Sequence, residues 1–311
     1  MSELILRTRE LTRRYGRTLA LDRASLSVEK GQILGLVGRN GAGKTTLIRL
    51  ISGQSRPTSG ELALFGASSP SALDRARSRT GVMVETPAFY PYLTAEQNLE
   101  YYRIQRGIPG RSCVDEALEL VRLTGAGKKK FKTFSLGMKQ RLGLALALMN
   151  QPEFLLLDEP INGLDPEGIV EFRELLLRLN RERQTTILIS SHILSELSAL
   201  ATHYAFIDRG RMLETISAAD LRERCRDCLE LRVDDAARAA QVLEEQLGTR
   251  DFEVLPQERL RLYAFLAQPQ TVNRVLMEQG VGLISAQQKD SNLEDYFLSL
   301  IDGHSAGKEG V

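Results

Sequence analysis

One eight-residue stretch constrains the fold of this chain more than any other part of the sequence. It consists of Gly38, Arg39, Asn40, Gly41, Ala42, Gly43, Lys44 and Thr45. Glycines spaced in this way before a Lys-Thr pair are typical of a phosphate-binding P-loop, in which curled backbone directs N–H groups at a polyphosphate. Lys44 would supply a positive charge to the phosphates, and the Thr45 hydroxyl can bind Mg²⁺. The stretch therefore predicts that the chain binds ATP or GTP.

The residues on either side of the loop fit a strand–loop–helix unit. Residues 33–37 form a short apolar run bounded by glycines, as expected of a buried parallel strand. From Thr46 to Ile51, apolar residues continue at helical spacing. The loop would then lie at a helix N-terminus, where backbone N–H groups and the helix dipole favour phosphate. We therefore predict an α/β fold with a parallel sheet.

Two carboxylates follow a second strand of this kind. Residues 154–157 are all large and apolar, and Asp158 and Glu159 come directly after them. Burial of the strand would place both carboxylates at its carboxyl end. There, one can hold Mg²⁺ through water and its neighbour can polarise an attacking water molecule. The pair therefore predicts a hydrolytic nucleotide site.

Two further side chains follow predicted strands. Residues 81–84 lead to Glu85, and residues 186–189 lead to His192. Ligands of open parallel sheets bind at the carboxyl ends of the strands, so Glu85 is predicted to face the phosphates and the metal. A lone histidine is more often structural than catalytic, but this position favours a role for His192 at the same edge.

A second potential phosphate cradle precedes the helix predicted at residues 138–149. Ser135 and Gly137 offer a hydroxyl and a small residue at that helix N-terminus, for the same N–H and dipole reasons as in the P-loop. One nucleotide hardly needs two such cradles from a single chain.

Composition excludes several classes of protein. The 311 residues contain 41 Lys and Arg against 40 Asp and Glu, so the formal charge of +1 gives no general field for nucleic acid. No apolar run approaches the roughly 18 residues of a membrane-spanning helix. The N-terminus lacks the pattern of a signal peptide, which predicts a cytoplasmic protein. Cys225 and Cys228 have CxxC spacing, but without a second pair they are interpreted as thiols at a helix end.

In this order, the motifs resemble those of the nucleotide-binding domain of ABC transporters, over residues 1–221. The family aligns Tyr15 with its base-stacking aromatic; taken alone, Tyr15 is equally a half-buried structural tyrosine. Residues 134–138, Phe-Ser-Leu-Gly-Met, resemble the family signature, and residues 163–165 match a further motif. The resemblance implies a P-loop NTPase (ABC ATPase) core with an antiparallel β subdomain and a helical subdomain at about residues 88–150. Alternating strand and helix patterns in residues 222–311 predict a small C-terminal α+β domain.

The resemblance also assigns roles. Two such domains pair head to tail, so Ser135 and Gly137 would close over the ATP held by the P-loop of a partner. The P-loop residues through Thr46 bind the nucleotide, and Lys44 contacts the β- and γ-phosphates. The remaining assignments are Mg²⁺ ligation by Thr45, Glu85 and, through water, Asp158, general-base catalysis by Glu159, and γ-phosphate recognition by His192.

Two departures from the family pattern point to a branch of it. Glu85 replaces the usual glutamine, which adds a negative charge near the γ-phosphate, and the signature reads FSLGM where LSGGQ is usual. Both departures resemble the sequence pattern of the bacitracin-efflux and lantibiotic-immunity branch of bacterial peptide exporters.

The resemblance implies a function and a location. The chain would hydrolyse ATP as a dimer, expected to be a homodimer, on the inner face of the cell membrane, and drive export of a peptide antibiotic or similar compound through a separately encoded permease. The alternative is a soluble ABC-type ATPase acting on ribosomes or DNA. That alternative is disfavoured by the single set of motifs, by the near-neutral charge, and by the lack of room for a long coiled coil between Thr45 and Ser135.

Overall fold

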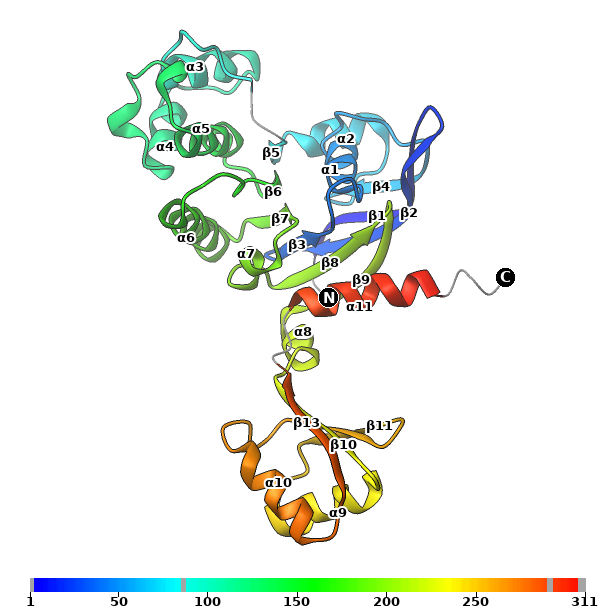
Figure 1. Cartoon of the computed structure of the whole chain (residues 1–311). Coiled ribbons are helices and arrows are strands. Elements are labelled where there is room, and N and C mark those ends of the chain that lie inside the picture. The colour runs from blue at the N-terminus through cyan, green and yellow to red at the C-terminus, as the bar shows by residue number, and fades with distance from the viewer. Residues whose placement is uncertain (1–2, 85–87, 290–292, 307–311) are drawn as a thin grey trace. The chain divides into compact units, whose positions relative to one another are not determined.

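The computed structural model describes residues 3–84, 88–289 and 293–306 (Figure 1). The chain divides into two compact units, Met1–Ala218 and Ala219–Val311. Helix α8 (Ala218–Arg224) spans both this division and the boundary predicted after residue 221. In the described residues, no helix combines the length and the apolar character needed to cross a membrane.

The first unit is built on a six-stranded sheet with the order β5-β6-β7-β3-β8-β9. Its strands are β3 (Ile33–Val37), β5 (Thr80–Met83), β6 (Phe154–Asp158), β7 (Thr186–Ser191), β8 (His203–Asp208) and β9 (Arg211–Ser217). All neighbours are parallel except β8 and β9. The P-loop strand β3 lies inside the sheet and is buried over its whole length. The predicted parallel α/β fold is therefore confirmed.

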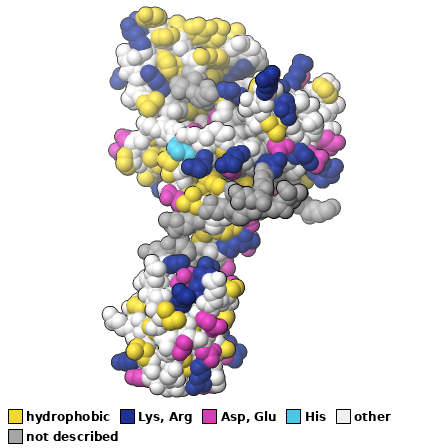
Figure 2. All heavy atoms as spheres, turned by 45° about the vertical axis from the view of Figure 1, so that its right-hand side comes forward, with side chains coloured by type: hydrophobic (Ala, Val, Ile, Leu, Met, Phe, Trp, Pro, Cys, Tyr) yellow, Lys and Arg dark blue, Asp and Glu magenta, His cyan; other side chains and the backbone are white. Residues whose placement is uncertain are grey.

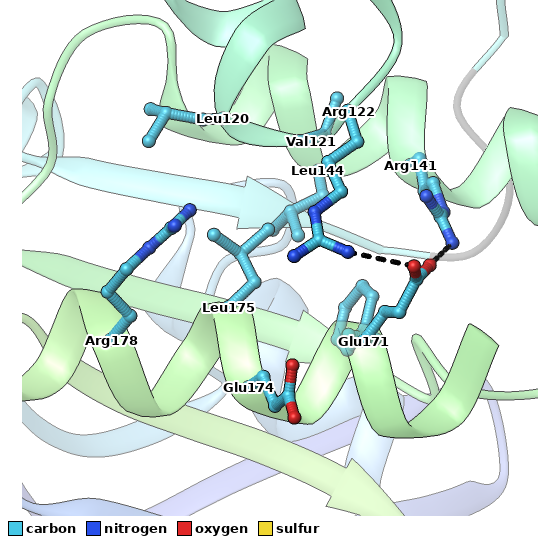
Figure 3. A pocket seen from close by; sticks show the side chains of 10 residues that line it. Leu120, Val121, Arg122, Arg141, Leu144, Glu171, Glu174, Leu175 and Arg178 are labelled. Carbon is cyan, nitrogen blue, oxygen red and sulfur yellow. Dashed lines mark hydrogen bonds and ion pairs between the residues drawn. The ribbon is translucent and has the colours of Figure 1, made fainter. Parts of the chain in front are cut away.

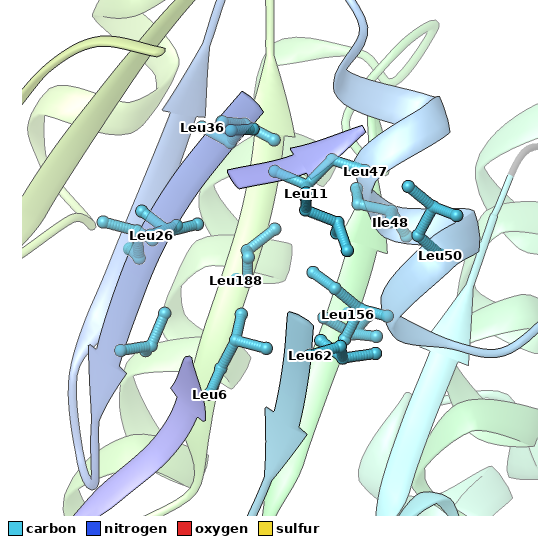
Figure 4. Close-up of a cluster of buried hydrophobic side chains, with 14 of the residues drawn as sticks. Leu6, Leu11, Leu26, Leu36, Leu47, Ile48, Leu50, Leu62, Leu156 and Leu188 are labelled. Carbon is cyan, nitrogen blue, oxygen red and sulfur yellow. The ribbon is translucent and has the colours of Figure 1, made fainter. Parts of the chain in front are cut away.

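A separate antiparallel sheet with the order β2-β1-β4 packs on this core. Its strands are β1 (Leu4–Tyr15), β2 (Thr18–Glu29) and β4 (Ser59–Leu64). Leucines from β1 and β2 join the P-loop helix α1 (Lys44–Ile51) and strands β6 and β7 in one buried cluster, which includes Leu11, Leu47 and Leu156 (Figure 4). Since α1 is packed between two sheets, the loop before it has a fixed position.

The helical part of the first unit contains α3 (Ala95–Gln105), α4 (Ser112–Leu120), the short 3-10 helices η1 (Thr124–Ala126) and η2 (Phe131–Thr133), and α5 (Leu136–Leu148). Helix α5 begins two residues before the start predicted at residue 138, because Ser135 caps it. Helices α2 (Pro70–Arg77), α6 (Pro166–Arg183) and α7 (Leu194–Ser198) complete the unit.

The second unit has the element order β-α-β-β-α-β. It contains β10 (Cys228–Val233), α9 (Ala236–Leu247), β11 (Phe252–Leu255), β12 (Arg259–Leu262), α10 (Pro269–Glu278) and β13 (Leu283–Lys289), followed by α11 (Leu293–Ala306). The sheet order β11-β12-β10-β13 with antiparallel neighbours is the ferredoxin-like arrangement. Buried side chains of β10 and β12 pack against α9 and α10, for example Leu231 against the cluster that contains Leu243 and Leu276.

Candidate functional site

The P-loop requires glycine at two places where its backbone meets other elements. A Cβ atom at Gly38 would lie 2.4 Å from the Ile207 carbonyl oxygen on β8. Gly43 has a left-handed φ of 110°, and a Cβ atom there would lie 2.8 Å from the Ala20 carbonyl oxygen on β2. Only glycine tolerates such close backbone approaches. The loop is therefore shaped by its neighbours before any ligand arrives.

The positive charge of the loop is buried and held by oxygens. Lys44 is 4% exposed, and its ammonium donates hydrogen bonds to the Gly38 carbonyl at 2.6 Å and the Arg39 carbonyl at 3.2 Å. Its Nζ also lies 3.1 Å from the Glu159 carboxylate. Arg39, Asn40 and Gly41 are exposed, and Ala42 is buried. Thr45 and Thr46 occupy the first turn of α1 and are half-buried.

The strand ends bring the predicted carboxylates into the same place. Asp158 ends β6 and pairs in register with Ser190 on β7, and Val37 at the end of β3 pairs with Ser191. The Ser190 hydroxyl donates to Asp158 at 2.7 Å and accepts the Glu159 backbone N–H at 2.9 Å. Ser190 therefore fixes both carboxylate-bearing residues, although the sequence did not single it out. The signal was its position at the end of the neighbouring parallel strand.

Glu159 is the centre of a polar cluster. Besides Lys44, its carboxylate contacts His192 Nδ1 at 3.0 Å and accepts a hydrogen bond from the Asn162 amide. Its φ of 45° lies in the left-handed region, which non-glycine residues seldom adopt and which often marks functional positions. Asn162 is not among the predicted site residues, so its contact with Glu159 is a finding of the structure.

The surroundings of Glu159 control its protonation. Burial raises the pKa of its carboxyl, but the hydrogen bond from Lys44, the charge of Lys44, the Asn162 amide and the charge of His192 together outweigh burial. The pKa of Glu159 therefore lies below its ordinary value. The side chain is an ionised carboxylate at neutral pH.

Tyr15 contacts a different set of residues. Its hydroxyl lies 3.2 Å from Ser55 Oγ, and the Arg13 guanidinium lies 4.4 Å from the centre of its ring. The hydrogen bond with Ser55, opposed by burial and supported by Arg13, lowers the pKa of Tyr15. The residue is 42% exposed, so its ring is accessible for stacking.

The second cradle is capped by its own chain. The Ser135 hydroxyl accepts the Met138 backbone N–H at 3.3 Å at the start of α5. The neighbouring Leu136 is 48% exposed and packs on Gly163, where a Cβ atom would lie 2.3 Å from Leu136 Cδ2. Gly137 faces Leu164. The unusual leucine in the signature is therefore accommodated by a glycine in the turn after Glu159.

Helix α5 is also tied to α6 beside a small cavity of about 160 Å³ (Figure 3). Glu171 on α6 forms ion pairs with Arg141 on α5 and with Arg122, the latter at 2.9 Å (Figure 3). This triad joins the helical part of the unit to the helix that follows the Glu159 turn. None of the predicted site residues lines this cavity.

The residues present fit a magnesium nucleotide. The cradle leaves no room for a side chain at Gly38 and Gly43, and the buried Lys44 offers a cation next to it. The Thr45 hydroxyl and the Asp158 carboxylate are hard oxygen donors of the kind Mg²⁺ prefers. Within residues 3–84, 88–289 and 293–306 there is no group of three or more His, Cys, Asp and Glu that would hold a metal without other ligands. The predicted ligand Glu85 lies outside the described residues.

Comparison with known proteins agrees with this geometry. Residues 21–162 match the family model described as ABC transporter. The chain is 42% identical over 303 residues to the bacitracin transport ATP-binding protein BcrA of Bacillus licheniformis, covering 97% of this chain and 99% of that one. It is 38% identical to the lantibiotic transport ATP-binding protein SrtF of Streptococcus pyogenes over 209 residues, covering 67% of this chain and 89% of the relative.

Among solved structures, the dimeric structure of MJ0796, a bacterial ABC transporter cassette, matches with a TM-score of 0.64 at 23% identity. The match covers 69% of this chain and 99% of that cassette, and it concerns the fold. The full-length identity to a transport ATP-binding protein carries the family assignment. The chain belongs to the ATP-binding proteins of ABC transporters and is an ABC-type ATPase.

Proposed function

We propose that this protein is the ATP-binding subunit of a bacterial exporter for a peptide antibiotic such as bacitracin, a lantibiotic, or a similar amphipathic compound. The observation that carries the proposal is the similarity to BcrA, whose name states bacitracin transport and which aligns over 97% of this chain. That alignment includes residues beyond the ATPase unit. It therefore supports a shared transport function in addition to a shared ATPase domain. A role on ribosomes or DNA has no comparable support.

We assign the site residues as follows. Residues Gly38 to Thr46 hold the nucleotide, with Tyr15 beside its base, and Thr45 and Asp158 hold Mg²⁺ together with Glu85. ATP supplies the phosphoanhydride bond that is broken, and Mg²⁺ neutralises phosphate charge. Lys44 binds the β- and γ-phosphates, Glu159 takes the proton of the attacking water, and His192 contacts the γ-phosphate.

The contacts of Lys44 suggest how the site is activated. In the structure its ammonium is 3.1 Å from Glu159, so a bound phosphate would compete with that carboxylate. Once Lys44 turns to phosphate, Glu159 keeps its contacts with His192 and Asn162 but loses its strongest partner. The lost contact with Lys44 is the largest of the interactions that lower the pKa of Glu159 in this structure.

We propose that the working form is a head-to-tail homodimer. Leu136 and Gly137 face the turn at residues 163–164 of their own chain. We assign Ser135 and Gly137 to the nucleotide held by the partner. The cassette MJ0796, whose fold this chain shares, is described as dimeric. Each site then takes its P-loop from one chain and its signature from the other.

We propose that exposed apolar residues of the helical part dock on the separately encoded permease. Tyr90, Tyr92, Tyr101 and Ile104 are 44%, 72%, 42% and 64% exposed. In Figure 2 apolar side chains gather at the top of the larger unit, at the height where Figure 1 shows α3. Exposed apolar patches of this kind mark protein contacts. This contact would hold the protein at the inner face of the cell membrane.

Affinity purification from detergent-solubilised membranes tests the transporter assignment. We expect the tagged chain to recover a polytopic membrane protein, and the double variant Tyr92→Ser, Ile104→Ser to recover much less while still binding ATP. The matched control is Val170→Ser, which removes an exposed apolar side chain on α6 and should change nothing. If no membrane protein is ever recovered with the wild-type chain, the assignment is wrong.

A growth assay tests the substrate class. Cells that lack this protein should become more sensitive to bacitracin or to lantibiotics, and the wild-type chain should restore growth while Glu159→Gln should not. If sensitivity to all of these peptides is unchanged although the permease is recovered, the transporter assignment stands and the proposed class of cargo is wrong.

A further inference from the structure

The two edges of the sheet in the second unit differ in how they are protected. Strand β11 has four residues, carries Glu253, whose carboxylate accepts the Tyr263 hydroxyl at 3.2 Å, and is followed by Pro256. Short length, charge and proline are the devices that prevent an edge strand from pairing with another chain. Strand β13 at the other edge has seven residues, and the first six contain no charge, glycine or proline. It has none of these devices over most of its length.

The outer edge of β13 is also open to solvent. Residues 284–288 are all exposed, and Ile284 is 61% exposed. The inner edge of β13 pairs with β10 from Lys289 opposite Cys228 to Leu283 opposite Val233, and in the described part of the chain no strand pairs with its outer edge. Backbone donors and acceptors along that edge are therefore available to another strand.

Helix α10 contacts β13, and Leu283 packs against the buried cluster of the sheet, whereas residues 284–288 are exposed. Ala286 lies opposite Leu231 and Gln288 opposite Leu229 in the register, so these side chains share the helix-bearing face of the sheet. Leu229 and Leu231 are at most 2% exposed beneath α9 and α10, whereas Ala286 and Gln288 are exposed. At Ala286 and Gln288 this face of the strand is therefore open to solvent.

We infer that β13 pairs with β13 of a second copy of this chain, which joins two four-stranded sheets into one. The register that pairs the whole strand antiparallel with itself is centred on Ala286. It places Ser285 opposite Gln287, Ile284 opposite Gln288 and Leu283 opposite Lys289. In this register every residue of β13 has a partner in the second copy.

Charge favours this partner. The only charged residue of the strand is Lys289, whose ammonium is already paired with Glu230 at 2.8 Å. In the register centred on Ala286, the two Lys289 residues lie at opposite ends of the strand pair, so like charges do not face each other. Pairing with a second copy therefore requires no charged residue on the partner strand.

The area of this contact decides its role. One pair of seven-residue strands buries less than the roughly 1,200 Å² of a stable, independent interface. It gains strength when two chains are already held together, because the effective concentration then reaches the order of millimolar. In that respect the inference rests on the proposed dimer, in which β13 pairing would supply a contact that needs no nucleotide.

Disulfide crosslinking tests the pairing directly. The variant Ala286→Cys is made in the full chain with Cys113, Cys225 and Cys228 replaced by alanine, and is oxidised at high concentration without nucleotide. Opposite Cβ atoms in such a pair are about 4.5–5.5 Å apart, close enough for a disulfide after small adjustments. We expect a covalent dimer from Ala286→Cys and none from the matched control Val254→Cys, which is 52% exposed on the β11 edge.

Charge exchange tests the register independently. Ala286→Lys and Ala286→Glu each place like charges opposite one another and should lower the dimer fraction in sedimentation, whereas an equal mixture of the two should restore it. The same pair of substitutions at Val254 should change nothing. Equal crosslinking from both edges, crosslinking of position 286 to a different protein, or no rescue by mixing would overturn the inference. ATP-dependent dimers of Glu159→Gln would persist in that case, so failure here is distinguishable from failure of the proposed function.

Discussion

Two helix N-termini in the first unit share a backbone geometry but differ in their surroundings. Helix α1 begins after Gly43 without a side-chain cap, beside the buried ammonium of Lys44 and the carboxylates of Asp158 and Glu159. Helix α5 begins after Ser135, whose hydroxyl already accepts the Met138 N–H, beside the exposed Leu136. A helix terminus favours phosphate only modestly until charge and shape are added. We therefore propose that the first terminus binds the nucleotide and that the second completes the site of a partner chain.

The comparison of the two helix N-termini predicts the largest mutational effect at Glu159, which lies beside α1. We expect Glu159→Gln to lower the rate of ATP hydrolysis by about 10²- to 10⁴-fold, since it removes the proposed general base, while ATP affinity changes little. Steady-state hydrolysis and equilibrium binding of a fluorescent ATP analogue measure the two effects. A variant that retained wild-type turnover would show that the base lies elsewhere.

Mixing variants tests whether the two termini act in different chains. Lys44→Ala removes the P-loop cation, and Ser135→Asp keeps a helix cap while directing a negative charge at phosphate. Each variant alone should be nearly inactive. An equal mixture should recover roughly a quarter of wild-type activity, because half of the randomly formed dimers contain one intact site. A mixture no more active than its components would show that the sites are not shared.

Ser190 sharpens the comparison, because among the described residues at the start of α5 none forms a matching pair of hydrogen bonds. We expect Ser190→Ala to lower kcat by about tenfold, since Asp158 loses its hydroxyl donor and the Glu159 N–H its acceptor. Ser190→Thr, which keeps the hydroxyl, is the matched control. Equal loss in both variants would indicate a packing defect instead of a lost hydrogen bond.

The smallest expected effect concerns pH. The pKa of Glu159 is lowered in the folded protein, so its ion pair stabilises the fold above the ordinary carboxyl value of 4.5. This contribution is lost as the pH falls through the lowered folded pKa. Thermal unfolding should therefore show a difference between wild type and Glu159→Gln of at most a few degrees at neutral pH, vanishing in acid. A difference that persisted unchanged at low pH would contradict the ion-pair explanation.

Much of this site was predictable because its parts are local patterns. The P-loop and the strand before Asp158 can each be recognised from fewer than ten consecutive residues. Since parallel strands bring their carboxyl ends to one edge of the sheet, the residues after them are expected to lie together. Asn162 and Ser190 were not predictable, because their roles depend on a turn conformation and on strand register. The packing of Leu136 on Gly163 likewise depends on a tertiary contact.

In the second unit, too, local sequence patterns predict the elements but not the tertiary contacts between them. Its strands and helices were predicted from residue patterns, yet the order β11-β12-β10-β13 depends on which distant strands pair. The strand ends differ as well. The pattern of residues 260–266 predicts a strand over that range, but β12 ends at Leu262. The pattern of residues 281–286 predicts the last strand, but β13 extends to Lys289. Those last residues of β13 are part of the edge to which we assign a partner.

The position of β13 next to β10 has a further consequence. The strand that begins this sheet and the strand that ends it are neighbours, with Cys228 opposite Lys289. Residues so paired have Cα atoms about 4.5–5.5 Å apart, so the chain enters and leaves the sheet through almost the same point. Residues 229–288 can therefore be regarded as one large closed loop. A short linker could replace it, or it could be grafted between adjacent residues of another protein, as a transplantable cassette.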